Sequence, residues 1–226
     1  MNRTTLFGYW RSSATWRVRI GLHLLGIDFQ YAPVHLVKDG GQQRSPTHRL
    51  RNPMEQVPVL TWTAQGHKHR LTQSLAILEY LNQHVAGSLL PSDPFPRARA
   101  RQLAEMVNAG IQPLQNLWLM NTITQSGADG RAIAREAIQR GLAALEAECS
   151  LASELPTAAQ PGDWLVGNAP SIADICLIPQ IYNARRFHVD LAPFPTLRRV
   201  DQLAAEHPSF RLAHPDAQPD ALPPLA

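Results

Sequence analysis

Two serines lie where a predicted strand meets a predicted helix, in the segment Trp10-Arg11-Ser12-Ser13. The start of a helix exposes backbone N–H groups that have no partner within it, at the positive end of the helix dipole. An anion is stabilised there. A thiolate is such an anion, and a serine hydroxyl that donates a hydrogen bond to it lowers the thiol pKa. Ser12 and Ser13 therefore predict a thiolate site, although either serine could simply cap the helix.

Two later turns predict contacts with a peptide or an anion. Val57-Pro58 precedes a predicted strand, and a cis bond there would leave the Val57 N–H and C=O free to pair with an extended peptide. Ser74 follows Gln73 at the start of another predicted helix, where it could hold a carboxylate or act as a cap. Each turn is weak evidence alone. Three such turns in one small domain make the stronger case for a binding site.

The elements that would position these turns form a mixed pattern. Val18, Leu22 and Leu25 recur at helical spacing, and a turn at Gly66 separates two strand-like runs. We expect strands over 5–9, 29–32, 59–62 and 70–72, and helices over 13–25, 44–50 and 74–84. The order β-α-β-α-β-β-α predicts a small mixed sheet covered by helices.

The second half of the chain reads as helical. Three prolines in 87–96 indicate a linker, so we predict domains over 1–86 and 94–226. Helices are expected over 97–120, with a bend at Pro113, and over 131–155 and 196–206. Ser171 and Asp174 predict a capping box at the start of a further helix. The tail from residue 213 is rich in proline, and we expect it to be extended.

Composition excludes several classes of protein. The 226 residues carry 21 Lys and Arg against 18 Asp and Glu, and the basic residues are scattered, which argues against a nucleic-acid surface. Two cysteines, Cys149 and Cys176, cannot form a disulfide framework, and we expect both in the core of a cytoplasmic protein. No run suits a signal peptide or a membrane span. His67 and His69 lack a third ligand, so no metal is expected.

These segments resemble the zeta class of the glutathione transferases, which includes maleylacetoacetate and maleylpyruvate isomerases. The resemblance covers nearly the whole chain and implies a thioredoxin-like N-terminal domain, an all-helical C-terminal domain, bound glutathione and a homodimer. The matching strings are Ser12-Ser13-x-x-Trp16-Arg17-Val18-Arg19-Ile20, Gly40-Gly41-Gln42-Gln43, Leu50-x-Asn52-Pro53-Met54-x-Gln56-Val57-Pro58, Gln73-Ser74-Leu75-Ala76-Ile77-x-Glu79-Tyr80-Leu81, Gly110-Ile111-Gln112-Pro113-Leu114-Gln115-Asn116-Leu117 and Ala173-Asp174-x-Cys176-Leu177-x-Pro179-Gln180.

The resemblance also implies roles for individual residues. Ser12 would stabilise the glutathione thiolate, with Ser13 beside it. Positions that hold the glutathione backbone and its γ-glutamyl end are matched by Gln43, Val57, Gln73 and Ser74. Second-domain positions near glutathione and substrate are matched by Gln112 and Asn116. Arg11 matches an arginine at the site mouth, and Arg186 matches one that grips a dicarboxylate, although Arg185 and Arg186 could instead form a solvated helix face.

The implied activity is glutathione-dependent cis–trans isomerisation of 4-maleylacetoacetate to 4-fumarylacetoacetate, in phenylalanine and tyrosine breakdown. The thiolate would add to the cis double bond, the bond would rotate, and elimination would regenerate glutathione. Ala14 stands where the zeta pattern commonly has a cysteine, and Trp118 where a smaller residue is usual. These departures leave three alternatives open: a maleylpyruvate isomerase, a general zeta-class transferase acting on α-halo acids, and a non-catalytic glutathione-binding protein.

Overall fold

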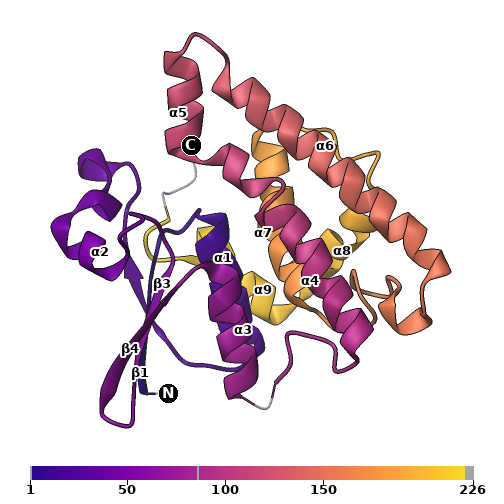
Figure 1. Cartoon of the computed structure of the whole chain (residues 1–226), viewed down its shortest axis with the longest axis horizontal. Coiled ribbons are helices and arrows are strands. Elements are labelled where there is room, and N and C mark those ends of the chain that lie inside the picture. The colour runs from indigo at the N-terminus through magenta and orange to yellow at the C-terminus, as the bar shows by residue number, and fades with distance from the viewer. Residues whose placement is uncertain (1, 86, 222–226) are drawn as a thin grey trace. The chain divides into compact units, whose positions relative to one another are not determined.

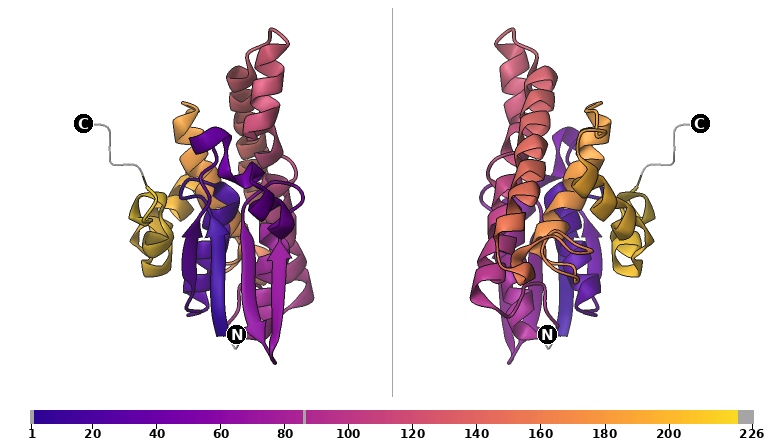
Figure 2. Two further views of the ribbon diagram at one scale, coloured as in Figure 1. Left: turned by 90° about the vertical axis from the view of Figure 1, so that its left-hand side faces the viewer. Right: turned by 90° about the vertical axis from the view of Figure 1, so that its right-hand side faces the viewer.

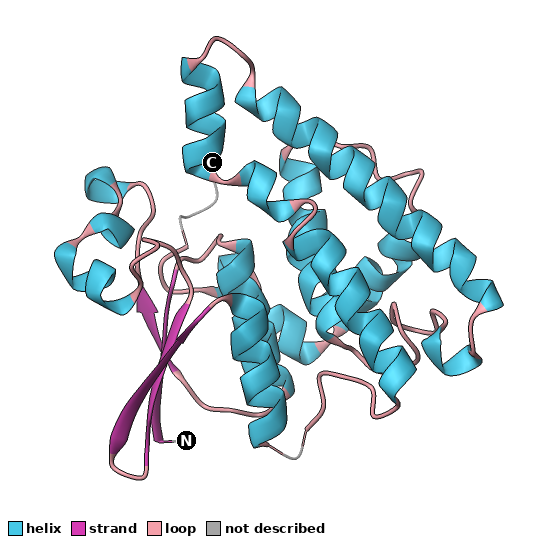
Figure 3. Cartoon of the chain, viewed as in Figure 1, coloured by secondary structure: helices cyan, strands magenta, loops and turns pink. Residues whose placement is uncertain are grey.

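The computed structural model describes residues 2–85 and 87–221, which form two compact units (Figure 1). The first unit contains the described residues up to Leu89, together with those from His207 onward. The second unit is Leu90–Glu206. Strands are confined to the first unit, and the second is built from helices and loops, as the colours of Figure 3 show for the described chain.

A four-stranded sheet forms the centre of the first unit. Its strands are β1 (Asn2–Gly8), β2 (Gln30–Pro33), β3 (Val59–Ala64) and β4 (His67–Thr72). Their order is β2-β1-β3-β4, with β1 parallel to β2, and β3 antiparallel to both β1 and β4. The parallel pair requires a crossover, which a helix provides. The predicted order β-α-β-α-β-β-α is confirmed.

Helices pack against this sheet. They are α1 (Ser13–Leu24) and α3 (Ser74–His84), whereas the short α2 (Pro46–Arg51) joins the strands through hydrogen bonds from Arg70 of β4 to the Leu50 and Arg51 carbonyls. Figure 1 shows α1 and α3 side by side along the sheet. Val18 and Leu22 from α1 meet Leu6, Leu60 and Ile77 in a core from which water is excluded. Burial of such apolar side chains supplies the main free energy that holds the helices on the strands.

The second unit contains five helices in its described residues. They are α4 (Pro94–Asn108), α5 (Leu117–Gln125), α6 (Gly130–Leu151), α7 (Ile172–Arg186) and α8 (Pro195–Glu206). Helix α4 packs on α7, and α5 lies beside α6 in both views of Figure 2. Cys149 and Cys176 are buried and unbridged, which confirms their prediction as core residues. No helix of the described chain is long and apolar enough to cross a membrane.

The predicted helix over 97–120 is wrong in its middle, because the chain breaks there rather than bends. Helix α4 ends at Asn108, a short 3-10 turn covers Gln112–Gln115, and α5 begins only after Asn116. Pro113 lies within that turn, where its ring and its missing N–H prevent an α-helix from continuing. Gln112 is half-buried in this break, and Pro113 and Leu114 are exposed.

The tail from residue 213 is not extended throughout, contrary to what was expected: Ala213 is the last residue of α9 (Pro208–Ala213), and a 3-10 turn covers Pro215–Ala217. Each of these two elements starts with the proline that suits a first helical position. Helix α9 packs on α1, so these residues join the first unit, although the predicted second domain included them. Arg19 on α1 donates a hydrogen bond to the Ala213 carbonyl at the end of α9, a contact that local sequence patterns do not reveal. Residues 222–226 of the predicted tail lie outside the described residues.

The predicted capping box at the start of α7 is confirmed. Asp174 is fully buried, and its carboxylate accepts hydrogen bonds from the Ser171 N–H at 2.8 Å and the Leu165 N–H at 2.9 Å. Burial raises the pKa of the Asp174 carboxyl to about 6, and these hydrogen bonds oppose that rise. Asp174 therefore joins the loop before α7 to the helix as a folding residue.

Asp174 should make stability depend on pH in a defined direction. The pKa of Asp174 in the folded protein lies above the ordinary value of 3.8. Its contribution to the free energy of unfolding is therefore fully present below pH 3.8 and is lost as the pH rises through about 6. Asp174→Asn cannot titrate and should destabilise the fold by about 1–3 kcal/mol. We expect the gap in unfolding free energy between the two proteins to be larger at about pH 4.5 than at about pH 7.5 in urea denaturation. A gap that widens toward pH 7.5 would contradict this.

Candidate functional site

The three turns of interest meet one edge of the sheet. In the strand register Phe7 pairs with Val59, and Val59 pairs with Thr72. The turn after β1, the turn before β3 and the turn after β4 therefore leave the sheet at the same end. The predictions from separate sequence segments thus converge on one surface of the first unit.

Ser12 is the N-cap of α1, and this role leaves its hydroxyl proton available. Its Oγ accepts a hydrogen bond from the Thr15 N–H at 3.2 Å, while its own N–H donates to the Tyr9 carbonyl at 3.0 Å. A serine hydroxyl accepts with its lone pairs and still has one O–H to donate. Ser12 is half-buried, Ser13 is buried as the first helical residue, and the first turn holds no acidic side chain. The cap and the thiolate donor are therefore compatible roles.

Gly8 allows β1 to pass close to this helix start. A Cβ at Gly8 would lie 2.2 Å from the Cγ2 of Thr15, a side chain with no exposed surface. Thr15 Oγ1 also accepts a long hydrogen bond from the Tyr9 N–H. The turn between β1 and α1 is consequently tight, and its geometry is set by residues on both sides of Ser12.

The side chains of His48 and Asn52 hold the turn at Val57 through the carbonyl of the preceding residue, and the sequence analysis assigned neither of them a role. The Val57-Pro58 bond is cis. The Gln56 carbonyl accepts from Asn52 Nδ2 at 2.8 Å and contacts His48 Nε2 at 2.9 Å, so that ring nitrogen carries the proton. Neither the N–H nor the C=O of Val57 has a hydrogen-bond partner among residues 2–85 and 87–221. The turn thus offers both groups to an extended peptide.

The start of α3 is open to an anion. Gln73 precedes the helix with a φ of 67° and makes no side-chain cap. Ser74 is the first helical residue, so the alternative that it caps the helix does not hold. Its hydroxyl is buried and accepts from Arg17 Nη1 at 3.4 Å. The Arg17 guanidinium and the N–H groups at the start of α3, which have no side-chain cap, both favour a carboxylate at this position.

Gln43 carries a buried acceptor with no partner. Its Nε2 donates to the Leu36 carbonyl at 3.3 Å, whereas its Oε1 is unpaired in the part of the chain that the structure describes. Gly41 permits this arrangement, with a φ of 100° and Gln43 where a Cβ would be. An unpaired buried acceptor costs about 1–3 kcal/mol, so a ligand N–H that reached it would be stabilised.

Two arginines differ sharply in their surroundings in the second unit. Arg185 is exposed and forms an ion pair with Asp201, which fits the alternative of a solvated helix face. Arg186 is half-buried, and its Nη1 donates to the Asn183 Oδ1 at 3.2 Å. The solvated-face alternative thus fits Arg185 rather than Arg186, and the binding of a dicarboxylate by Arg186 stays a prediction. Gln112 and Asn116 are half-buried within the break between α4 and α5, at the two ends of its 3-10 turn.

A buried chain of amides connects these second-unit residues. Asn183 Nδ2 donates to Gln115 Oε1 at 2.8 Å, and Gln115 Nε2 donates to Gln180 Oε1 at 2.8 Å. The network joins the segment of Gln112 and Asn116 to the end of α7 that carries Arg186. The matching strings include Gln115 and Gln180 without a role for either, and Asn183 lies outside those strings. The signal that could have found all three is a polar side chain at a core-facing position.

Comparison with known proteins places this geometry in a family. The family model for the glutathione S-transferase N-terminal domain matches residues 2–83, and that for the C-terminal domain matches residues 96–226. The chain belongs to the glutathione S-transferase family. The predicted fold, a thioredoxin-like domain followed by a helical domain, is therefore confirmed.

Individual relatives narrow the resemblance. The chain is 42% identical to the maleylacetoacetate isomerase of Rattus norvegicus, over 96% of this chain and 95% of the relative. A structure of maleylacetoacetate isomerase from Anaeromyxobacter dehalogenans, with dicarboxyethyl glutathione and citrate in its active site, matches with a TM-score of 0.86, 44% identity and coverage of 98% and 95%. A bacterial zeta-class maleylpyruvate isomerase matches with a TM-score of 0.86, 36% identity and coverage of 96% and 100%.

The amide network should be important for stability, whereas the Arg185 ion pair should not. Asn183→Ala leaves Gln115 with an unpaired buried oxygen and should lower the free energy of unfolding by about 1–3 kcal/mol. Arg185→Ala breaks only an exposed pair and should cost at most about 1 kcal/mol. Urea denaturation monitored by circular dichroism measures both values. Equal losses in the two variants would show that the network does not support α7 as described.

Proposed function

We propose that this protein is a glutathione-dependent cis–trans isomerase that converts 4-maleylacetoacetate to 4-fumarylacetoacetate. One observation carries the proposal: Ser12, at the open start of α1, keeps a hydroxyl proton for a thiolate at the sheet edge where two other turns offer groups to a peptide. The full-length similarity to maleylacetoacetate isomerases supports the same conclusion.

The residues at this edge fit the chemistry of glutathione, an acidic tripeptide with a thiol. Val57 would pair with its backbone, Gln43 would accept one of its N–H groups, and Gln73 and Ser74 would hold its γ-glutamyl end. When bound, glutathione supplies a nucleophilic sulfur that can add reversibly to a cis double bond. Ser12 and the helix dipole would keep that sulfur ionised near neutral pH, with Ser13 beside them. A related structure with bound glutathione derivative supports this assignment.

The substrate carries two carboxylates, and two arginines of the chain could each bind one of them. Arg11, whose guanidinium lies 5.2 Å from the Trp10 ring centroid, and Arg186, held by Asn183, would each bind one. Their positive charge would also favour the negative charge that develops on the substrate's carbonyl oxygen. Gln112 and Asn116 are proposed to line the substrate region. Citrate in the active site of the related isomerase supports a preference for polycarboxylates.

Maleylpyruvate is the second candidate substrate. The similarity to a maleylpyruvate isomerase favours it specifically, because that protein matches this fold as well as the maleylacetoacetate isomerase does. Assays of the purified protein with glutathione and each maleyl acid would compare kcat/KM directly. Rapid conjugation of an α-halo acid without isomerisation would overturn the proposal. The homodimer and the cytoplasmic location stay predictions.

Ser12 variants should separate the cap from the thiolate donor. Ser12→Ala loses both and should cost about 1 kcal/mol of stability and about 100-fold in kcat/KM. Ser12→Asp keeps a capping oxygen but has no proton to donate at neutral pH, so it should regain the stability and not the activity. Thermal unfolding and isomerisation assays measure the two effects. If Ser12→Asp turned over like the wild type, the hydroxyl donor would not be needed.

The two neighbouring arginines offer a matched pair of variants. Arg186→Ala should raise the KM for the maleyl acid and lower kcat/KM by about 10–100-fold, because a charged partner of a carboxylate is lost. Arg185→Ala should change kcat/KM less than about threefold, since its exposed guanidinium already pairs with Asp201 of the chain itself. Glutathione affinity, measured by calorimetry, should stay the same in both. A larger loss in Arg185→Ala would reverse the assignment.

A further inference from the structure

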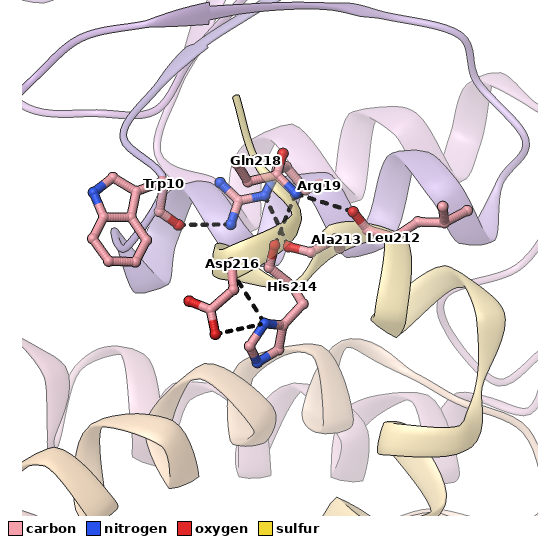
Figure 4. A network of polar contacts seen from close by, with 7 residues as sticks. All are labelled: Trp10, Arg19, Leu212, Ala213, His214, Asp216 and Gln218. Atoms are coloured by element: carbon pink, nitrogen blue, oxygen red, sulfur yellow. Dashed lines mark hydrogen bonds and ion pairs between the residues drawn. The ribbon is translucent and has the colours of Figure 1, made fainter. Parts of the chain in front are cut away.

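The last described residues of the chain reach back to the turn that carries Ser12. Arg19, which lies on α1 and has no exposed surface, donates from Nη2 to the Trp10 carbonyl at 2.8 Å and from Nε to the Ala213 carbonyl at 3.0 Å. Figure 4 shows its guanidinium between these two carbonyl groups. One buried cation therefore joins the turn, the helix and the C-terminal segment.

Asp220 binds the backbone N–H of Trp10, the residue whose carbonyl accepts from Arg19. Its Oδ2 accepts from the Trp10 N–H at 3.0 Å and from the Tyr31 hydroxyl at 3.3 Å. Both backbone polar groups of Trp10 are thus held by side chains of opposite charge. Ala221 packs against the apolar cluster that contains Trp10 and Val57. The C-terminal segment consequently contacts the supports of two glutathione-binding turns.

The C-terminal segment is itself fixed. Gln218 Nε2 donates to the carbonyls of Leu212 at 3.0 Å and His214 at 2.8 Å, which closes the segment into a compact turn. The imidazole of His214 packs edge-on against Trp16, with ring centroids 5.2 Å apart. Figure 4 shows this turn beside Arg19. A segment ordered in this way can act as a rigid support.

We propose that Asp220 is a positioning residue for Ser12, and that the C-terminal segment fixes the thiolate site of the first unit. Trp10 lies two residues before Ser12, so a shift of its peptide groups turns the Ser12 hydroxyl and the first N–H groups of α1. Hydrogen bonds to charged groups are stronger than neutral ones, so Asp220 and Arg19 restrict that shift. Small displacements at a reacting group can lower rates steeply. The inference rests on the proposed glutathione chemistry.

The charges on the two partners support this role. Burial lowers the pKa of Arg19 to about 10, and the nearby Tyr31 and Asp220 act to raise it, so the guanidinium stays protonated near neutral pH. Arg19 and Asp220 then neutralise each other across the Trp10 backbone. Loss of Asp220 would leave the Trp10 N–H unpaired in a buried turn, which costs free energy and loosens the segment.

The test is the pKa of the bound glutathione thiol, read from thiolate absorbance in the ultraviolet. Asp220→Ala should raise this pKa and lower kcat by about tenfold, while the affinity for S-methylglutathione, which has no thiol to ionise, changes less than about threefold. Tyr31→Phe, which removes only one partner of Asp220, should shift the thiol pKa in the same direction by less. Tyr31→Phe provides the test if Asp220→Ala fails to fold.

Asp216→Ala is the matched control. Asp216 is an exposed carboxylate in the same segment, its side chain pairs with His214 at 3.7 Å, and among the described residues no hydrogen bond joins it to Trp10. This variant should leave the thiol pKa and kcat unchanged. The proposal is overturned if Asp220→Ala and Tyr31→Phe lower thermal stability yet keep the wild-type thiol pKa and kcat. A wild-type protein whose bound thiol had the pKa of free glutathione would instead refute the proposed function itself.

Discussion

The start of helix α1 is the constraint on which the first unit depends. Its backbone N–H groups have to stay free for a ligand, yet the turn before it has to stay rigid. The serine cap satisfies one N–H group and leaves a hydroxyl proton. Gly8 lets the strand approach the helix closely, and Arg19 and Asp220 bind the backbone of Trp10 from both sides. Rigidity thus comes from residues that leave the helix start open.

At the other candidate contacts, too, one residue offers a group to the ligand and different residues hold it in place. Val57 offers its backbone groups while His48 and Asn52 hold the carbonyl of the residue before it. Arg186 is held by Asn183, which belongs to a buried amide network. Ser12 and Arg186 are half-buried, whereas the residues that hold their surroundings, such as Arg19 and Asn183, are buried and hydrogen-bonded. Such supporting contacts determine how well a site is preorganised.

Sequence reasoning reached the local features and missed the distant ones. The strand and helix order, the capping box at Asp174 and the exposed helix start at Ser12 follow from patterns within a few residues, and the structure has all three. The ligand roles came from resemblance. The contact of Asp220 with Trp10 joins residues 210 positions apart, so no local pattern could predict it. Pro113 was expected to bend a helix, whereas α4 ends at Asn108 and Pro113 lies in a separate 3-10 turn, where its ring and missing N–H prevent an α-helix from continuing.

In the proposed reaction the reactive sulfur belongs to glutathione and not to the chain. Cys176 is buried, and burial raises the pKa of the Cys149 thiol to about 12, so neither is suited to act as a nucleophile. The most direct test is the rate of maleylacetoacetate isomerisation with glutathione and with S-methylglutathione at saturation. Turnover with glutathione and none above background with the methylated analogue is the predicted result. Isomerisation supported equally by S-methylglutathione would contradict it.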